Sequence, residues 1–114
     1  MPHFIIHCSQ NVIQLQAPEK IMQAVYDTAE ATALFSKGDI KVRIDPYQYY
    51  NVGNSKNDFI HVFAYIMQGR DTEQKSNLSH TIVTKLKELF PEVPVISINV
   101  SDFEKATYCN RLMI

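Results

Sequence analysis

The chain has 114 residues, of which 46% are hydrophobic and 20% are charged, a composition that is typical of a folded globular protein and excludes a wholly disordered one. Its net charge of -1 gives no general attraction for nucleic acid or an anionic membrane, and its apolar runs are far shorter than the ~20 residues that span a bilayer. The first residues also lack the basic region and apolar stretch of a secretory signal. We therefore expect a cytoplasmic protein with a single domain over residues 1–114 and no nucleic-acid or membrane partner.

The first half of the chain predicts a strand, a helix and a second strand. Residues 3–8 form a short apolar run that ends at Ser-Gln-Asn, which is typical of a strand. Residues 17–35 carry apolar side chains at spacings of three and four, which predicts a helix, and residues 39–47 alternate as a strand does. The helical stripe consists of Ile21, Met22, Val25, Ala29 and Ala33. The alternation places Ile40, Val42 and Ile44 on one face and Lys41, Arg43 and Asp45 on the other.

The second half repeats this order after a polar loop. Residues 59–67 are apolar on both faces, which favours a central strand. Asp71 and Gln74 form a capping-box pattern at the start of a helix that Pro91 ends. A last strand over residues 94–103 precedes a short tail from about residue 104. The helical stripe consists of Leu78, Ile82, Leu86, Leu89 and Phe90, and one strand face consists of Ile96, Ile98 and Val100.

These elements predict an α/β (α+β) protein of order β-α-β-β-α-β, with residues 2–50 and 58–104 as an architectural pseudo-repeat. Right-handed crossovers would place two helices on one face of a four-stranded sheet. The other face and the sheet edges would stay uncovered, which favours self-association.

Three cations form one candidate site. Lys41 and Arg43 share a strand face, and Arg70 lies between the third strand and the second helix. If the crossover brings these ends together, the three side chains would surround a small polyanion. The alternative is a solvated strand face with an unrelated loop arginine.

Histidine and cysteine residues give no clear metal pattern. His3 and His7 share a strand face, but no carboxylate or cysteine stands at ligand spacing beside them. Cys8 and Cys109 form no short ligand motif, and we expect both as reduced thiols. We therefore expect no metal site.

Pro2 admits two interpretations. Proline is tolerated as the first residue of a strand. Removal of Met1, however, would expose a secondary amine that no internal residue can supply.

Four stretches together resemble one family over nearly the whole chain: "MPHFIIHCS", "GDIKVRI", "FIHVFAYIMQGRDTEQK" and "VISINVSDFEKATYCNR". They are similar to the 5-carboxymethyl-2-hydroxymuconate Δ-isomerases of the tautomerase superfamily. The resemblance implies a homotrimeric, cofactor-independent isomerase of aromatic-compound catabolism that acts on a small polycarboxylate by general acid-base catalysis. It also implies that the N-terminal proline is the catalytic base.

By position, the resemblance assigns the base to Pro2 and a substrate-binding arginine to Arg70. The family's second arginine falls at Lys41, a departure that replaces a two-pronged planar group by a point charge. Arg43 is a candidate to compensate. We expect Phe4 and the cluster 47–50, with its three tyrosines, to supply apolar walls.

Two other functions stay open from the sequence. The chain could be a non-catalytic oligomeric module that binds a small anion, with Pro2 as a strand-start residue. It could also be a broad keto-enol tautomerase that acts on a smaller 2-oxo acid.

Overall fold

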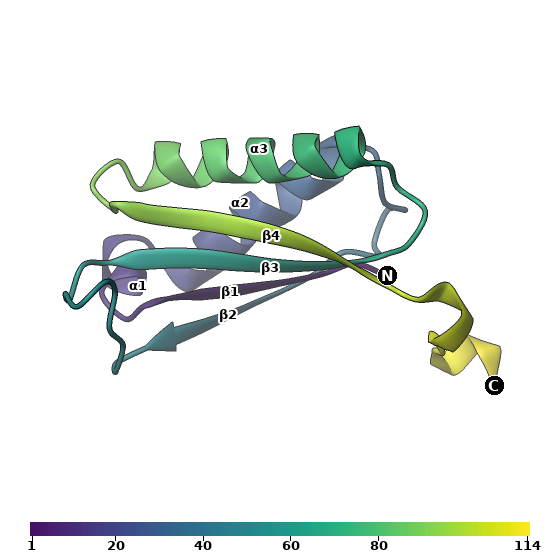
Figure 1. Cartoon of the computed structure of the whole chain (residues 1–114), viewed down its shortest axis with the longest axis horizontal. Helices are drawn as coiled ribbons and strands as arrows, with labels where there is room; N and C mark the ends of the chain where they lie inside the picture. The colour runs from purple at the N-terminus through teal and green to yellow at the C-terminus, as the bar shows by residue number, and fades with distance from the viewer.

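The computed structural model describes all residues, 1–114, and orders them as four strands and three α-helices (Figure 1). Two short 3-10 helices follow the last strand. The α-helices and strands are β1 (His3–Ser9), α1 (Val12–Leu15), α2 (Pro18–Ala31), β2 (Lys41–Tyr47), β3 (Phe59–Met67), α3 (Thr72–Leu89) and β4 (Val95–Phe103). The predicted β-α-β-β-α-β order is confirmed, with α1 as an addition.

The four strands form one mixed sheet in the order β2-β1-β3-β4. β1 pairs parallel to β2, with His3 beside Lys41, and antiparallel to β3. β3 in turn pairs parallel to β4. β3 is therefore central, as its two apolar faces predict, while β2 and β4 are the sheet edges.

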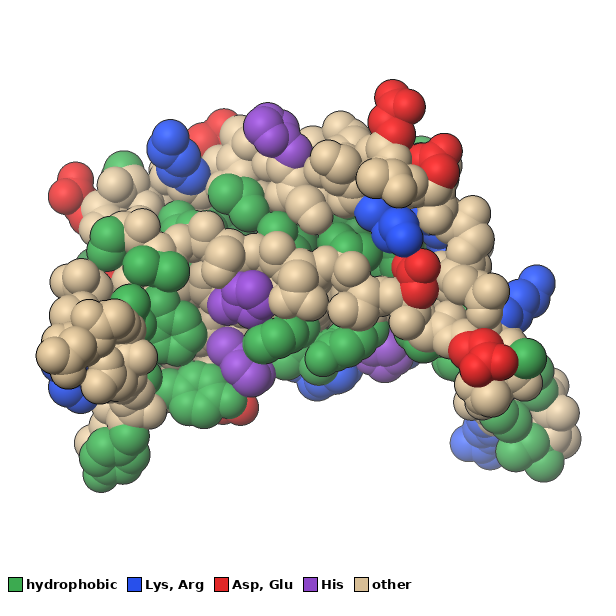
Figure 2. Space-filling model, viewed as in Figure 1, with side chains coloured by type: hydrophobic (Ala, Val, Ile, Leu, Met, Phe, Trp, Pro, Cys, Tyr) green, Lys and Arg blue, Asp and Glu red, His purple; other side chains and the backbone are tan.

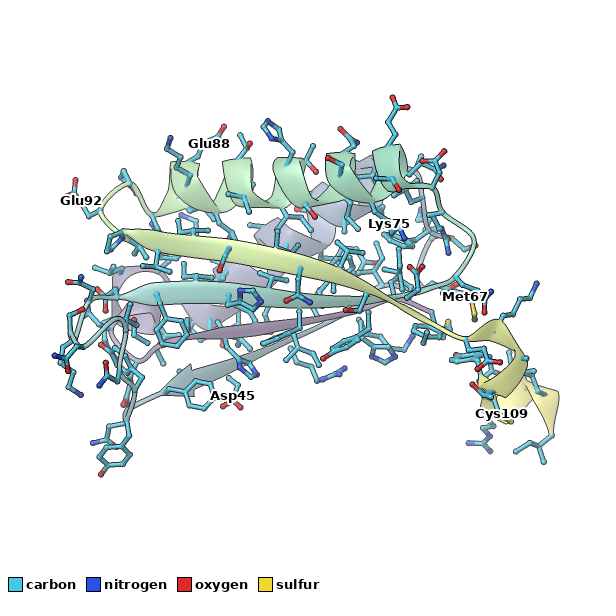
Figure 3. All side chains as sticks on the ribbon, viewed as in Figure 1. Asp45, Met67, Lys75, Glu88, Glu92 and Cys109 are labelled. Carbon is cyan, nitrogen blue, oxygen red and sulfur yellow. The ribbon has the colours of Figure 1, made fainter.

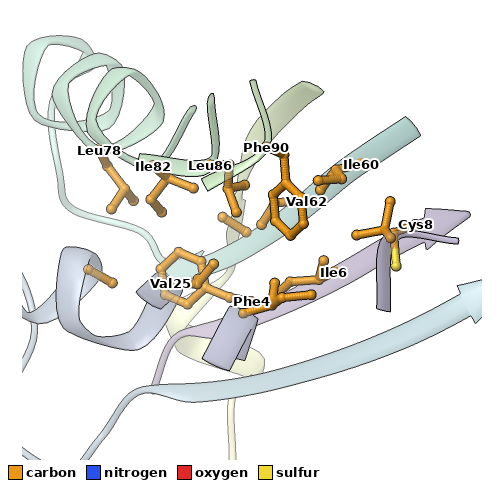
Figure 4. Close-up of a cluster of buried hydrophobic side chains, with 14 of the residues drawn as sticks. Phe4, Ile6, Cys8, Val25, Ile60, Val62, Leu78, Ile82, Leu86 and Phe90 are labelled. Atoms are coloured by element: carbon orange, nitrogen blue, oxygen red, sulfur yellow. The ribbon is translucent and has the colours of Figure 1, made fainter. Parts of the chain in front are cut away.

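Both long helices cover one face of the sheet, and the core lies between these layers (Figures 1 and 4). Phe4 from β1, Val62 from β3 and Leu86 from α3 are fully buried in it. Because the register aligns Phe4 with Val42 and with Ala64, the alternate residues of each strand share this face. The alternate residues of the strands and the apolar stripes of the helices therefore form one apolar layer.

The first long helix ends earlier than its sequence pattern predicts. α2 stops at Ala31 and Thr32 caps it, so the prediction that Ala33 continues the buried stripe is wrong. Ala33 is exposed and has a φ of 60°, in the left-handed region that helices of L-residues avoid. The single-turn helix α1 buries only Val12, and no pattern in the sequence predicts it.

The opposite face of the sheet is not covered by either helix, and it carries histidine and aromatic side chains (Figure 2). His61 lies between two β4 side chains, with its Nδ1 2.6 Å from Ser97 Oγ and its Nε2 2.6 Å from Asn99 Oδ1. The Phe63 ring packs edge-on against His7, with the ring centroids 5.0 Å apart. We refer to this surface as the open face.

A C-terminal tail of residues 104–114 leaves the body beyond the end of β4 (Figure 1). Met67, which pairs with Phe103, lies at the sheet end from which the tail departs (Figure 3). The backbone N–H of Lys105 donates to Gln68 Oε1 at 2.6 Å and ties the base of the tail to the end of β3. None of the helices combines the length and hydropathy needed to cross a bilayer.

Candidate functional site

The sheet topology brings the chain start and two of the predicted cations to one end of the molecule. β1 and β2 run parallel, so Lys41 at the start of β2 lies beside His3 at the start of β1. β3 runs antiparallel to β1, so its last residues reach the same end, and Arg70 follows three residues after Met67. Strand direction alone therefore places the N-terminus, Lys41 and Arg70 together.

The N-terminal amine lies in an environment that disfavours its charged form. Burial lowers the pKa of the Met1 amine, and the positive charges of Lys41 and Arg70 lower it further, while the Asp39 carboxylate opposes them. Pro2 is buried, and its carbonyl accepts a hydrogen bond from the Lys41 backbone N–H at 3.1 Å. This bond joins the chain start to the edge strand.

Lys41 points back toward the chain start. Its Nζ donates to the backbone carbonyl of Asp39 at 3.0 Å and lies 3.7 Å from Met1 Sδ. The side chain is partly buried and has no carboxylate partner within ion-pair distance. Its charge is therefore not neutralised by an acidic side chain in direct contact.

Arg70 is held by backbone carbonyls. One amino group donates to Met67 at 3.2 Å and the other donates to Leu34, in the connection between α2 and β2. The guanidinium carbon lies 5.2 Å from the centroid of the Phe35 ring. These contacts fix the half-buried arginine next to the chain start, and a carboxylate partner again is absent.

Arg43 is placed differently from the other two cations. It is exposed on the open face, where its Nη1 lies 3.1 Å from His3 Nδ1. Burial lowers the pKa of His3, and Arg43 and Lys41 lower it further. The predicted set of three cations is thus divided into a pair at the amine, Lys41 and Arg70, and a neighbour that contacts His3.

The predicted apolar walls lie elsewhere. Phe4 is fully buried on the helix side of the sheet, so the prediction that it lines a substrate site is wrong for direct contact. Tyr47 ends β2 beside Ser9, six residues or about 20 Å along the strand from Lys41, so the 47–50 cluster does not line a site at Pro2 of the same chain. The half-buried aromatic next to Arg70 is Phe35, which the sequence pattern included in the first long helix and did not single out as a site residue, whereas the helix ends at Ala31.

A hollow of about 250 Å³ lies next to His3, under the base of the tail. Its other lining residues are Phe103, Glu104, Thr107 and Tyr108. Larger hollows, up to about 660 Å³, lie on the outer side of the helices and are lined mainly by threonine and other polar residues. They do not include the N-terminal amine, Lys41 or Arg70. No group of three histidine, cysteine or acidic residues is arranged to hold a metal ion.

A mixed four-stranded sheet under two helices, with a buried chain start beside two cations, confirms the tautomerase-like fold that the resemblance implies. The chain belongs to the 5-carboxymethyl-2-hydroxymuconate isomerase family, whose model matches residues 2–109. A 5-carboxymethyl-2-hydroxymuconate Delta-isomerase of Escherichia coli is 25% identical over 92 residues, which cover 79% of this chain and 73% of that protein.

Solved structures show the same fold. A 5-carboxymethyl-2-hydroxymuconate isomerase from Deinococcus radiodurans R1 superimposes with a TM-score of 0.83 at 22% identity, covering 96% of this chain and 88% of the other. Pt0534 inactivated by 2-oxo-3-pentynoate gives 0.80 at 17% identity, covering 96% and 91%. A fused 4-OT asymmetric trimer gives 0.79 at 10% identity, covering 96% and 92%. At these identities the likeness concerns the fold alone.

Proposed function

We propose that this chain is a cofactor-independent isomerase that moves a proton within a carboxylated enol of the 5-carboxymethyl-2-hydroxymuconate type. The observation that carries the proposal is the environment of the chain start. Burial lowers the pKa of the Met1 amine, Asp39 opposes this effect, and Lys41 and Arg70 lower the pKa further. We expect the same groups to act on the Pro2 amine that removal of Met1 would expose at this end of the sheet. A lowered pKa favours the neutral amine, the form that acts as a general base, and two cations beside it suit a substrate that carries several carboxylates.

The base is assigned to Pro2 after removal of Met1. Its neutral nitrogen takes a proton from the enol oxygen or from the carbon α to the carbonyl. An N–H bond forms as that O–H or C–H bond breaks, and the electron pair of the broken bond enters the conjugated system as a dienolate. The ammonium then returns the proton at another carbon, which restores the free amine. No oxidant or reductant is needed. The five-membered ring keeps the nitrogen lone pair in a fixed direction, which favours a near-attack geometry.

Arg70 and Lys41 are assigned to the anionic groups of the substrate. Arg70 has five N–H donors, of which two bind the carbonyls of Leu34 and Met67, so three remain for a carboxylate or for the developing oxyanion. Lys41 supplies a single charged group on a flexible stem. Such preorganised charges act where the negative charge develops, which is usually a large contribution to catalysis. Arg43, in contact with His3, is a candidate for a more distant carboxylate.

We propose further that the protein is a cytoplasmic homotrimer. The open face exposes a row of aromatic and histidine side chains, and a surface of this kind is typically covered by another protein surface. The fused 4-OT structure of the same fold is an asymmetric trimer. Both cysteines are unpaired, which suits a reducing compartment.

The decisive experiment asks whether Pro2 is a free and reactive amine. Intact mass of the native protein shows whether Met1 is removed. The processed protein is then treated with 2-oxo-3-pentynoate, whose alkyne is conjugated to a ketone: the amine forms an N–C bond at the distal alkyne carbon, and a proton is taken up at the neighbouring carbon. We expect one adduct per chain, located at Pro2, together with loss of isomerase activity.

The matched control is protein that retains Met1 or carries an acetylated N-terminus. It should be neither labelled at residue 2 nor active on 5-carboxymethyl-2-hydroxymuconate. Equal turnover by the blocked and the processed protein would refute the role of the amine. A native protein that keeps Met1 would do the same, and the anion-binding module would then be the better description.

A second candidate is a broad keto-enol tautomerase that acts on a smaller 2-oxo acid. The observation that favours it is Lys41 in place of the family's arginine, because a lysine orients a carboxylate less tightly than a guanidinium does. Rates on enols with one, two and three carboxylates separate the two functions. A preference for the tricarboxylate supports the isomerase, and a preference for the monocarboxylate supports the tautomerase.

A further inference from the structure

Arg70 joins two segments that are far apart in the chain. Its amino groups donate to the carbonyl of Met67, at the end of β3, and to that of Leu34, 36 residues earlier. Hydrogen bonds to two carbonyls restrict the plane of a guanidinium, but they leave it free to tilt about the line between them. A further contact is needed to fix the direction of the three remaining donors.

Phe35 supplies that contact. Its ring lies under the guanidinium, with the Arg70 Cζ 5.2 Å from the ring centroid, a distance at which a cation and an aromatic face attract each other. The ring is itself supported from the core, because it packs edge-on against Phe4 at a centroid distance of 6.0 Å and an interplanar angle of 77°. Phe4 has no exposed surface, so its ring cannot easily move away from Phe35.

We propose that Phe35 is a positioning residue that orients the guanidinium of Arg70 toward the chain start, so that it grips a planar carboxylate with two parallel hydrogen bonds. The inference rests on the proposed function only for the identity of the anion. Phe4 packs against Phe35, and Phe35 packs against Arg70, so these contacts connect the orientation of the guanidinium to the hydrophobic core. A substrate carboxylate then meets an arginine that is already aligned.

The test removes the aromatic face while it keeps the apolar volume. In Phe35→Leu, nitrogen-15 relaxation of the Arg70 Nε–H should show a clear loss of order, and calorimetry should show about fivefold weaker binding of fumarate, a planar dicarboxylate. Phe35→Tyr keeps the ring and should restore both. Phe90→Leu is the matched control, because Phe90 is a core aromatic, 2% exposed, that makes no contact with Arg70.

A double-mutant cycle separates positioning from general damage. In an Arg70→Gln background, Phe35→Leu should cost no further fumarate affinity, because the ring acts through the arginine. If Phe35→Leu is poorly folded, Phe35→Met, which keeps a longer side chain, takes its place in both measurements. The kinetic counterpart is a rise in KM for the enol that exceeds the fall in kcat.

The proposal is overturned if Arg70 is as ordered in Phe35→Leu as in the native protein, or if the substitution weakens fumarate binding equally in the Arg70→Gln background. These outcomes are distinct from a failure of the proposed function. A native protein without isomerase activity refutes the function, while the order of the Arg70 Nε–H still decides whether Phe35 positions it.

Discussion

The helix that follows Arg70 depends on one capping box, and Asp71→Ala tests it. Asp71 Oδ1 accepts from the Gln74 backbone N–H at 2.8 Å, and Gln74 Oε1 accepts from the Asp71 backbone N–H at 2.9 Å. Substitution by alanine removes the first bond, which typically costs about 1 kcal/mol. It also removes a negative charge from the N-terminus of α3, which contributes about 0.5 kcal/mol more. We therefore expect a loss of about 1.5 kcal/mol in the free energy of unfolding.

Urea denaturation at neutral pH measures this loss, and the midpoint should fall without a change in slope. For a chain of this length, the melting temperature should fall by about 6 °C. Asp71→Ser is the matched control, since it keeps an oxygen that can accept from Gln74 and loses only the charge, so we expect a cost of about 0.5 kcal/mol. An alanine variant within 0.3 kcal/mol of the native protein, or equal costs for serine and alanine, would show that the box contributes nothing.

Three further outcomes are expected. Burial lowers the pKa of the Met1 amine and Asp39 opposes this effect, and we expect Asp39 to act in the same direction on the Pro2 amine once Met1 is removed. Asp39→Asn should therefore shift the acidic limb of kcat/KM to lower pH, because activity needs the neutral amine, and a shift to higher pH would contradict the assignment. Lys41→Arg should raise kcat/KM for a tricarboxylate enol by about tenfold through a two-pronged contact, and an unchanged steady-state value would mean that Lys41 does not face a carboxylate. Leu86→Ala, in the core, should lower the free energy of unfolding by about 2–5 kcal/mol, as measured by chemical denaturation. The same change at Leu112, which is 94% exposed, should lower it by less than about 0.5 kcal/mol, and similar losses for the two variants would show that Leu86 is not a core residue.

Much of the fold follows from periodicity in the sequence. The alternation from Ile40 to Asp45 predicts which side chains face the helices, and the register confirms it, with Val42 beside Phe4. The Asp71 pattern predicts the capping box that the structure contains. These features depend on residues close together in the chain, and local spacing is enough to fix them.

Other features depend on contacts that local spacing does not contain. Both faces of β1 carry apolar side chains, so the sequence does not say whether Phe4 or Ile5 faces the helices. Tyr47 lies far from Pro2 because β1 and β2 run parallel, and strand direction sets that distance. Phe35 follows a helix end with a left-handed residue, a conformation that no pattern in the alanine-rich segment indicates. Contacts between segments that are distant in the sequence determine where each of these residues lies.

Lys41 and Arg70 are both anchored by backbone carbonyls, and this has an electrostatic consequence. The only ion pair in the chain joins Lys75 on α3, labelled in Figure 3, to Asp102 on β4, and it includes neither Lys41 nor Arg70. A carbonyl dipole orients a cation without cancelling its charge, so the two positive charges still act on the solvent around the chain start, where the single Asp39 carboxylate opposes them. An incoming polyanion should therefore be drawn to this end from a distance, and its association rate should fall as added salt shortens the range of that attraction.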